Sequence, residues 1–132
     1  MTADYARRMG LTAGQKVREL GWDDDTDPAI QDSVRRVTGL ALLDDESPDR
    51  VDVVLYWWRN GDGDLASELA YDLGPVSDDV AIWILTPGAG LPGHAPPVDI
   101  TEAAADAGLR HASATALGAW TGHRLTRRPP AR

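Results

Sequence analysis

The strongest candidates for binding a ligand are carboxylates that come in short bursts next to aromatic residues. One burst directly follows Trp22, and a second follows Trp58 and Arg59. Carboxylates beside aromatic rings can hold a cation by charge and by cation–π attraction. The alternative is that both tryptophans pack at the edge of the core and that the carboxylates cap helices. We predict a ligand-binding site made of Trp22, Asp23, Asp24, Asp25, Trp58, Arg59, Asp62, Asp64 and His94.

The second burst partly matches a calcium-binding loop. Asn60, Asp62 and Asp64 occupy alternate positions, as the first ligands of such a loop do. The match then fails, because Leu65 stands where the loop needs Gly and Tyr71 stands where it needs Glu. We therefore expect no specific metal site.

Candidates for catalysis are few. The chain has no cysteine, and its histidines are isolated at positions 94, 111 and 123. No Ser or Thr stands in a Gly-x-Ser-x-Gly turn, and neither a P-loop nor a full dinucleotide fingerprint is present. The sequence therefore favours a non-catalytic domain over an enzyme, with no catalytic residue and no cofactor.

Length and charge narrow the class of protein. The 132 residues, 42% of them hydrophobic and 26% charged, fit one globular domain. A net charge of −8 argues against nucleic acid as a partner, because binding phosphates needs basic surface. No apolar run approaches the roughly 20 residues of a membrane span, and the N-terminus lacks a signal-peptide core. We expect a cytoplasmic protein with no membrane partner.

Positive charge collects at the end of the chain. Arginines stand at 124, 127, 128 and 132, with no acid among the last nine residues. We predict a single domain over residues 1–128 and a disordered basic tail over 129–132. A basic tail and an acidic body could also complement each other between copies, so self-association is a further hypothesis.

Apolar patterns alternate between strand and helix periodicity. The run 51–58 is almost continuously apolar, so both of its faces must be covered, which is typical of a parallel sheet with helices on each side. The pattern predicts a three-layer, Rossmann-like α/β sandwich, with a mostly parallel sheet closed by a C-terminal antiparallel hairpin. The predicted strands are 15–20, 40–43, 51–58 and 80–86. The predicted helices are 28–38, 65–76 and a third that a capping box opens at 99–102. The predicted hairpin pairs 111–117 with 119–127.

This arrangement also predicts where a ligand would bind. In open α/β sheets, ligands lie beyond the carboxyl ends of the strands, at the point where the strand order reverses. The turns at 21–27 and 58–64 and the loop at 86–97 all follow predicted strands. We therefore expect these segments to meet at one edge of the sheet. The loop is long enough to act as a lid, but the favoured interpretation is an irregular connection.

Three segments carry a resemblance to a known family. They are VRELGWDD at 17–24, DVVLYWWRNGDGDL at 52–65 and WILTP at 83–87. In this order they resemble an actinobacterial-type family of high-GC bacteria, known as domain of unknown function 3052. The likeness covers nearly the whole chain, and the paired tryptophans followed by Arg-x-Gly-Asp-Gly-Asp make it specific. It implies no activity.

A second likeness is to the Rossmann-like fold of methyltransferases that use S-adenosylmethionine. Such enzymes have a Gly-rich turn after the first strand, whereas residues 21–25 here contain one Gly, one Trp and three carboxylates. The carboxylate of the cofactor would meet like charge at this turn. The leading hypothesis is a non-catalytic, regulatory domain that binds a protein partner or a small, cationic ligand. The alternative is a degenerate or atypical methyltransferase-like enzyme.

Overall fold

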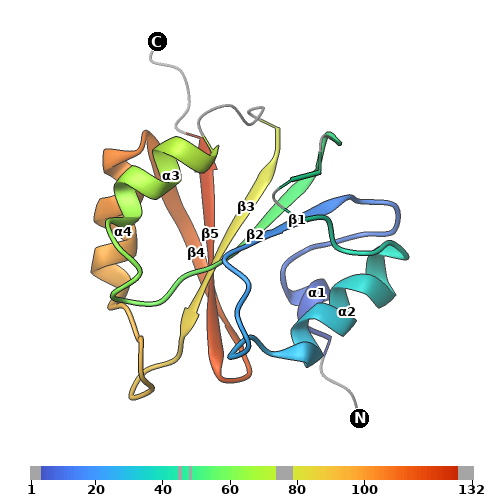
Figure 1. The fold of residues 1–132 in the computed structure, drawn as a ribbon, viewed down its shortest axis with the longest axis horizontal. Helices are drawn as coiled ribbons and strands as arrows, with labels where there is room; N and C mark the ends of the chain where they lie inside the picture. The colour runs from blue at the N-terminus through green and yellow to red at the C-terminus, as the bar shows by residue number, and fades with distance from the viewer. Residues whose placement is uncertain (1–3, 45, 48, 74–78, 128–132) are drawn as a thin grey trace.

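The computed structural model describes residues 4–44, 46–47, 49–73 and 79–127 (Figure 1). The predicted tail at 129–132 lies outside these ranges. Within them, no helix is both long and apolar enough to cross a bilayer. The elements are α1 (Tyr5–Arg8), β1 (Val17–Leu20), α2 (Pro28–Thr38), β2 (Val53–Trp57), α3 (Leu65–Leu73), β3 (Ala81–Pro87), α4 (Pro97–Asp106), β4 (Leu109–Leu117) and β5 (Trp120–Arg127).

The strands form one mixed sheet in the order β1-β2-β3-β5-β4. The first three are parallel, β5 runs antiparallel to β3, and β4 runs antiparallel to β5. The turn between β4 and β5 contains Gly118, whose φ of 68° is one that glycine adopts readily. The structure thus confirms a mostly parallel sheet closed by a C-terminal antiparallel hairpin.

A single residue of the predicted strand at 40–43 extends this sheet. Leu43 donates its N–H to the carbonyl of Val17 over 2.9 Å and accepts from the N–H of Glu19 over 2.7 Å. Because β2 takes the other side of β1, the chain first returns to the free edge of β1 and then crosses over to form β2. The strand order therefore reverses between β1 and β2, where ligands bind in sheets of this kind.

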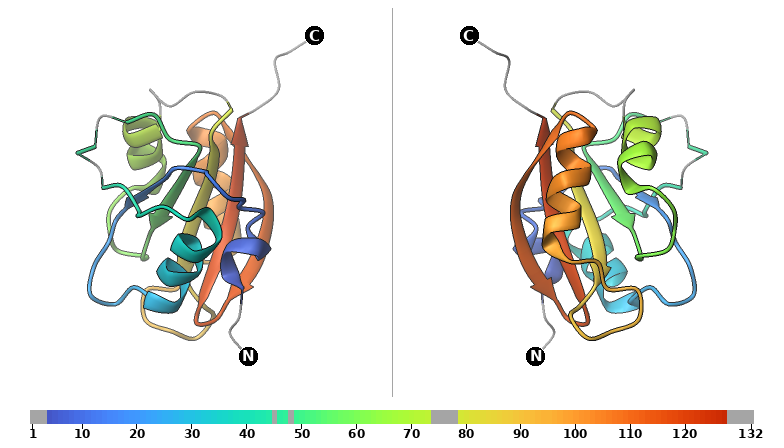
Figure 2. Two further views of the ribbon diagram at one scale, coloured as in Figure 1. Left: turned by 90° about the vertical axis from the view of Figure 1, so that its right-hand side faces the viewer. Right: turned by 90° about the vertical axis from the view of Figure 1, so that its left-hand side faces the viewer.

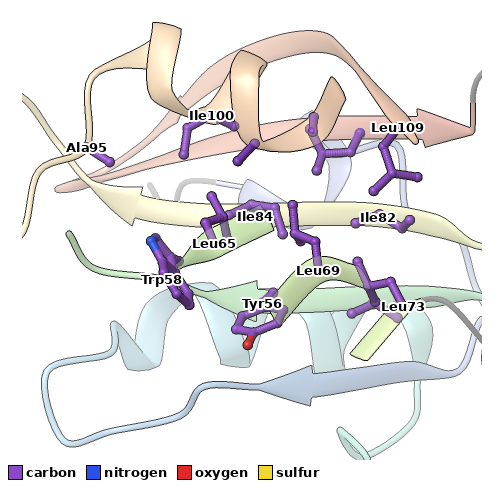
Figure 3. Packing of buried hydrophobic residues seen from close by; sticks show 14 of the residues in the cluster. Tyr56, Trp58, Leu65, Leu69, Leu73, Ile82, Ile84, Ala95, Ile100 and Leu109 are labelled. Atoms are coloured by element: carbon purple, nitrogen blue, oxygen red, sulfur yellow. The ribbon is translucent and has the colours of Figure 1, made fainter. Parts of the chain in front are cut away.

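Helices cover both faces of the sheet, which makes three layers (Figures 1 and 2). α1 and α2 lie on one face, and α3 and α4 lie on the other. The buried strand β2 serves both cores, because its side chains alternate between the faces. Trp57 packs beneath α1 and α2, whereas Tyr56 and Trp58 pack beneath α3 and α4 (Figure 3).

The helix α2 has the bounds that its local sequence predicts. The Asp27 carboxylate accepts from the N–H of Ala29 over 2.9 Å, and Pro28 occupies the first helical position. Gly39 ends the helix with a φ of 77°. Each of these signals lies within a few residues of the end it sets, so the sequence alone is sufficient to locate them.

The helix α4 begins earlier than predicted. Its N-cap is Pro96, which makes no side-chain capping bond, and its first residue is Pro97. A proline is tolerated in the first helical turn because the N–H it lacks has no partner there anyway. Asp99 therefore lies inside the first turn, and the predicted capping box between Asp99 and Glu102 is wrong.

The helix α1 has no counterpart among the predicted elements. It is only four residues long, too short for apolar periodicity to reveal it. Its position depends on packing against α2: Ala6 is fully buried and donates its N–H to the hydroxyl of Ser33 over 2.9 Å.

Candidate functional site

Arg59 lies at the reversal point, directly beyond the carboxyl end of β2. Its Nε donates to the Asp25 carboxylate over 3.0 Å, and its Nη2 donates to the other oxygen of the same carboxylate. Its Nη1 donates to the carbonyl of Gly21 over 2.7 Å. The side chain is 15% exposed. One guanidinium thus joins the turn after β1 to the end of β2.

Further contacts to its guanidinium, its Cβ and its backbone hold Arg59 in place. Its Cζ lies 5.5 Å from the centre of the Trp120 ring, a cation–π distance. A Cβ added at Gly93 would lie 3.0 Å from the Cβ of Arg59, so the 87–97 loop also approaches it closely. The Asp62 carboxylate accepts from the backbone N–H of Arg59 over 3.0 Å. Arg59 therefore occupies the place beyond the strand ends where ligands bind in sheets of this kind, which we call the Arg59 crevice.

The charges of this cluster support one another. Burial alone would lower the pKa of Arg59, but the hydrogen bond and the charge of Asp25 outweigh it, and the pKa is raised. The hydrogen bond from Arg59 lowers the pKa of Asp25, against an opposing effect of burial. Both groups are ionised at neutral pH.

Gly21 brings the turn after β1 against the backbone of β2. Its φ is 73°, and a Cβ at this position would lie 2.2 Å from the carbonyl oxygen of Trp57. Only glycine satisfies both conditions without a shift of the backbone. The close approach leaves no space between the two strand ends at this level.

The other predicted residues of the first turn lie on the surface. Trp22 is 61% exposed and lines an open pocket of about 470 Å³ together with Glu19 and Asp44. Asp23 accepts from the N–H of Asp24 through its own carboxylate over 2.8 Å. Among the described residues, the carboxylates of Asp23 and Asp24 form no hydrogen bond to Arg59.

Trp58 and Asp64 belong to a different pocket. They line a groove of about 260 Å³ between the beginning of α3 and the exposed side of α4. His94 lines neither pocket, and its Nδ1–H donates to the carbonyl of Pro87 over 2.9 Å. The predicted residues thus meet at one edge of the sheet but are divided among the Arg59 crevice, the Trp22 pocket and the Trp58 groove. Their role in binding stays a prediction.

Three carboxylates that the sequence prediction did not include complete the groove. They are Asp99, Glu102 and Asp106 of α4. Their spacing of three and four residues places them on one face of the helix, a signal that could have identified them. The predicted capping box concealed this spacing, because it assigned Asp99 and Glu102 to the end of the helix. Among the described residues, no three His, Cys, Asp or Glu side chains gather as a metal site would need.

The sheet, the two helical layers and the reversal between β1 and β2 define a Rossmann-like domain of the kind found in methyltransferases. An O-methyltransferase from neocarzinostatin biosynthesis, solved with S-adenosylmethionine, is similar with a TM-score of 0.65 at 11% identity. The likeness covers 96% of this chain and 51% of that chain, so this chain spans about half its length. The ribosomal protein L11 methylase of Lactobacillus delbrueckii subsp. bulgaricus gives a TM-score of 0.55 at 12% identity, covering 96% and 75%. At these identities the likeness concerns the fold alone.

Sequence places the chain more narrowly. Residues 6–129 match the profile of the family described as protein of unknown function (DUF3052), and the chain belongs to this family. The uncharacterized protein Rv2239c of Mycobacterium tuberculosis is 45% identical over 123 residues, which cover 93% of this chain and 78% of that protein. The uncharacterized protein Mb2263c of Mycobacterium bovis matches to the same extent.

Proposed function

We propose that this domain acts by binding a partner through its acidic carboxyl-edge surface and that it performs no methyl transfer. The observation that carries the proposal is the side chain of Arg59, which fills the crevice at the strand-order reversal. A cofactor bound at the usual place in this fold would compete with the Arg59–Asp25 pair and with the hydrogen bond to Gly21. Such a domain would act as a regulator through what it binds, in the cytoplasm expected from the sequence.

The energetics of the pair support this view. A two-pronged bond between a guanidinium and a carboxylate is among the stronger hydrogen-bonded pairs in proteins. A ligand that displaced Arg59 would leave Asp25 and the Gly21 carbonyl without their donor. It would also meet the carboxylates of the 21–25 turn, which disfavour a ligand that carries a carboxylate of its own.

Calorimetry with S-adenosylmethionine and its demethylated product tests the proposal. We expect no heat of binding with either compound at concentrations up to the millimolar range. A matched titration of Arg36→Ala, which removes an exposed arginine of α2 far from the crevice, should give the same result. Micromolar binding to the native protein would contradict the proposal.

A second candidate function is an atypical S-adenosylmethionine-dependent enzyme. The observation that favours it is the likeness of fold to methyltransferases. This candidate requires the Arg59 side chain to leave the crevice when the cofactor enters. It therefore predicts that the native protein binds S-adenosylmethionine and that Arg59→Ala binds it more tightly, whereas the first proposal predicts no binding to the native protein.

Charge reversal tests the surface itself. Asp24 and Asp64 are exposed and make no bond to Arg59 within the described part of the chain, so each can become Lys without opening the crevice. We expect the doubly reversed protein to lose partners that the native protein retains from a cell extract. An unchanged set of partners would show that binding does not use this surface.

A further inference from the structure

The groove beneath α4 combines an apolar floor with an acidic rim. Trp58 forms part of its floor, and Leu65 of α3 and Ile100 of α4 line its sides. All three belong to the buried core cluster under these helices (Figure 3). Its volume of about 260 Å³ lies just below the range of small-molecule sites, which begins near ~300 Å³. The groove therefore suits one long side chain.

The negative charge of the rim has no counterion among the residues that the structure describes. Asp64, Asp99, Glu102 and Asp106 line the groove. The ion pairs seen among the described residues involve Asp4, Asp32, Asp25 and Asp62. Within that part of the chain, the Asp64 carboxylate accepts only from the hydroxyl of Ser67, over 2.6 Å. The rim therefore attracts a cation from outside.

An independent feature of the floor points to a ligand with an acceptor. Trp58 is 5% exposed, and its indole nitrogen points toward the groove on the side of Ala95 (Figure 3). Its Nε1–H has no acceptor among the described residues, unlike that of Trp57, which donates to Glu19 over 2.8 Å. Nε1 of Trp83 is fully buried without an acceptor in the described part of the chain, whereas Nε1 of Trp58 is not fully buried and can receive its acceptor from the groove.

We propose that the groove binds a basic side chain of a protein partner, with the carboxylates holding its cation and Trp58 donating to a peptide carbonyl beside it. The assignment rests on the proposed function, since it names the chemistry of the partner. A peptide supplies both requirements at once, a cation on a flexible stem and a carbonyl within a few bonds. Arginine fits the rim better than lysine does, because its planar guanidinium can bond to two carboxylates.

The test is an NMR titration of the full chain with a capped Gly-Arg-Gly peptide. The indole signal of Trp58 is identified by its loss in Trp58→Phe. We expect this signal to shift saturably with the arginine peptide and not with the same peptide carrying citrulline, which has the same shape without the charge. Asp99→Asn with Glu102→Gln should weaken binding about tenfold, because charge-assisted bonds become neutral ones.

Asp32→Asn is the matched control, because it removes an exposed carboxylate of α2 on the opposite face of the sheet. It should leave the affinity unchanged. The proposal is overturned if the Trp58 signal does not move, if citrulline acts like arginine, or if the groove variant binds as the native protein does. Agmatine, which has the guanidinium but no carbonyl, should bind more weakly, and equal binding would overturn the assignment to a peptide. Binding of S-adenosylmethionine is measured separately, so failure here differs from failure of the proposed function.

Discussion

Nδ1 of His123 lies 3.1 Å from Nε2 of His111, at the centre of a hydrogen-bonded chain that crosses the sheet. The hydroxyl of Thr101 donates to the carbonyl of Pro97, so it must accept from Nδ1–H of His111. Nε2 of His111 is then the acceptor for Nδ1–H of His123, whose own Nε2 accepts from the hydroxyl of Thr86. In this assignment of donors and acceptors each ring carries one proton and is neutral.

Acid should weaken the fold through this pair. Burial, with smaller contributions from the charges of His111 and His94, lowers the pKa of His123 to about 4. Burial also lowers the pKa of His111. Because histidine in the unfolded chain titrates near ~6.5, the unfolded state binds more protons between about pH 6.5 and 4, and stability falls as the pH falls. His123 alone should lower the free energy of unfolding by about 2 kcal/mol between pH 7 and 5.

Urea unfolding at pH 7 and pH 5 measures this effect. His123→Gln keeps polar atoms near Thr86 and removes the titrating ring, so most of the difference between the two pH values should disappear. An equal loss of stability in the native and variant proteins would show that other groups cause it.

Removing the guanidinium of Arg59 should destabilise the domain. Arg59→Ala leaves the Asp25 carboxylate and the Gly21 carbonyl without their donor, at an expected cost of about 2 kcal/mol in the free energy of unfolding. Arg59→Lys should recover only part of this, since an ammonium cannot bond to both oxygens in the same planar geometry. Arg36→Ala serves as the control and should change the free energy by less than about 0.5 kcal/mol. Equal unfolding midpoints for Arg59→Ala and Arg36→Ala would refute the structural role of the pair.

A pair of glycine substitutions separates backbone strain from steric contact. Gly14 and Gly21 have similar φ values, 86° and 73°, but a Cβ at Gly14 meets nothing within 4 Å. Gly14→Ala should therefore cost only the ~1 kcal/mol of a left-handed alanine. Gly21→Ala adds a collision with the carbonyl of Trp57 and should cost at least about 2 kcal/mol more. Thermal unfolding of both variants gives the comparison, and similar losses would mean that the turn after β1 moves aside easily.

Glu19 joins β1 to the core beneath α2. One oxygen of its carboxylate accepts from Nε1 of Trp57 over 2.8 Å and from Nε2 of Gln31 over 2.6 Å. Glu19→Ala leaves both donors without this acceptor and should cost about 2–3 kcal/mol, measured by urea unfolding. Glu68→Ala, at an exposed position of α3, should cost less than about 0.5 kcal/mol. The prediction fails if the two variants unfold at the same urea concentration.

The sequence by itself determined the elements whose signals are local. The Asp27–Pro28 start and the Gly39 end are set by capping and by φ preferences, which act within a few residues. The apolar run around β2 predicted a strand covered on both faces, because each of its side chains needs a core to enter. The alternation of such elements was sufficient for the fold class. The sequence did not predict α1, because a helix of four residues is too short to show apolar periodicity. Its formation depends on contact with α2.

Only the tertiary structure decided which of these residues meet. Arg59 and Asp25 lie 34 positions apart, and they pair because β1 and β2 are neighbours in the sheet. The sequence placed both in one candidate site but could not reveal that they neutralise each other. In the same way, the groove exists because α4 packs beside α3 over Trp58, which leaves Asp99, Glu102 and Asp106 without a counterion in the described structure. Charge is a property of the sequence, whereas its compensation depends on distances that only the packed elements set.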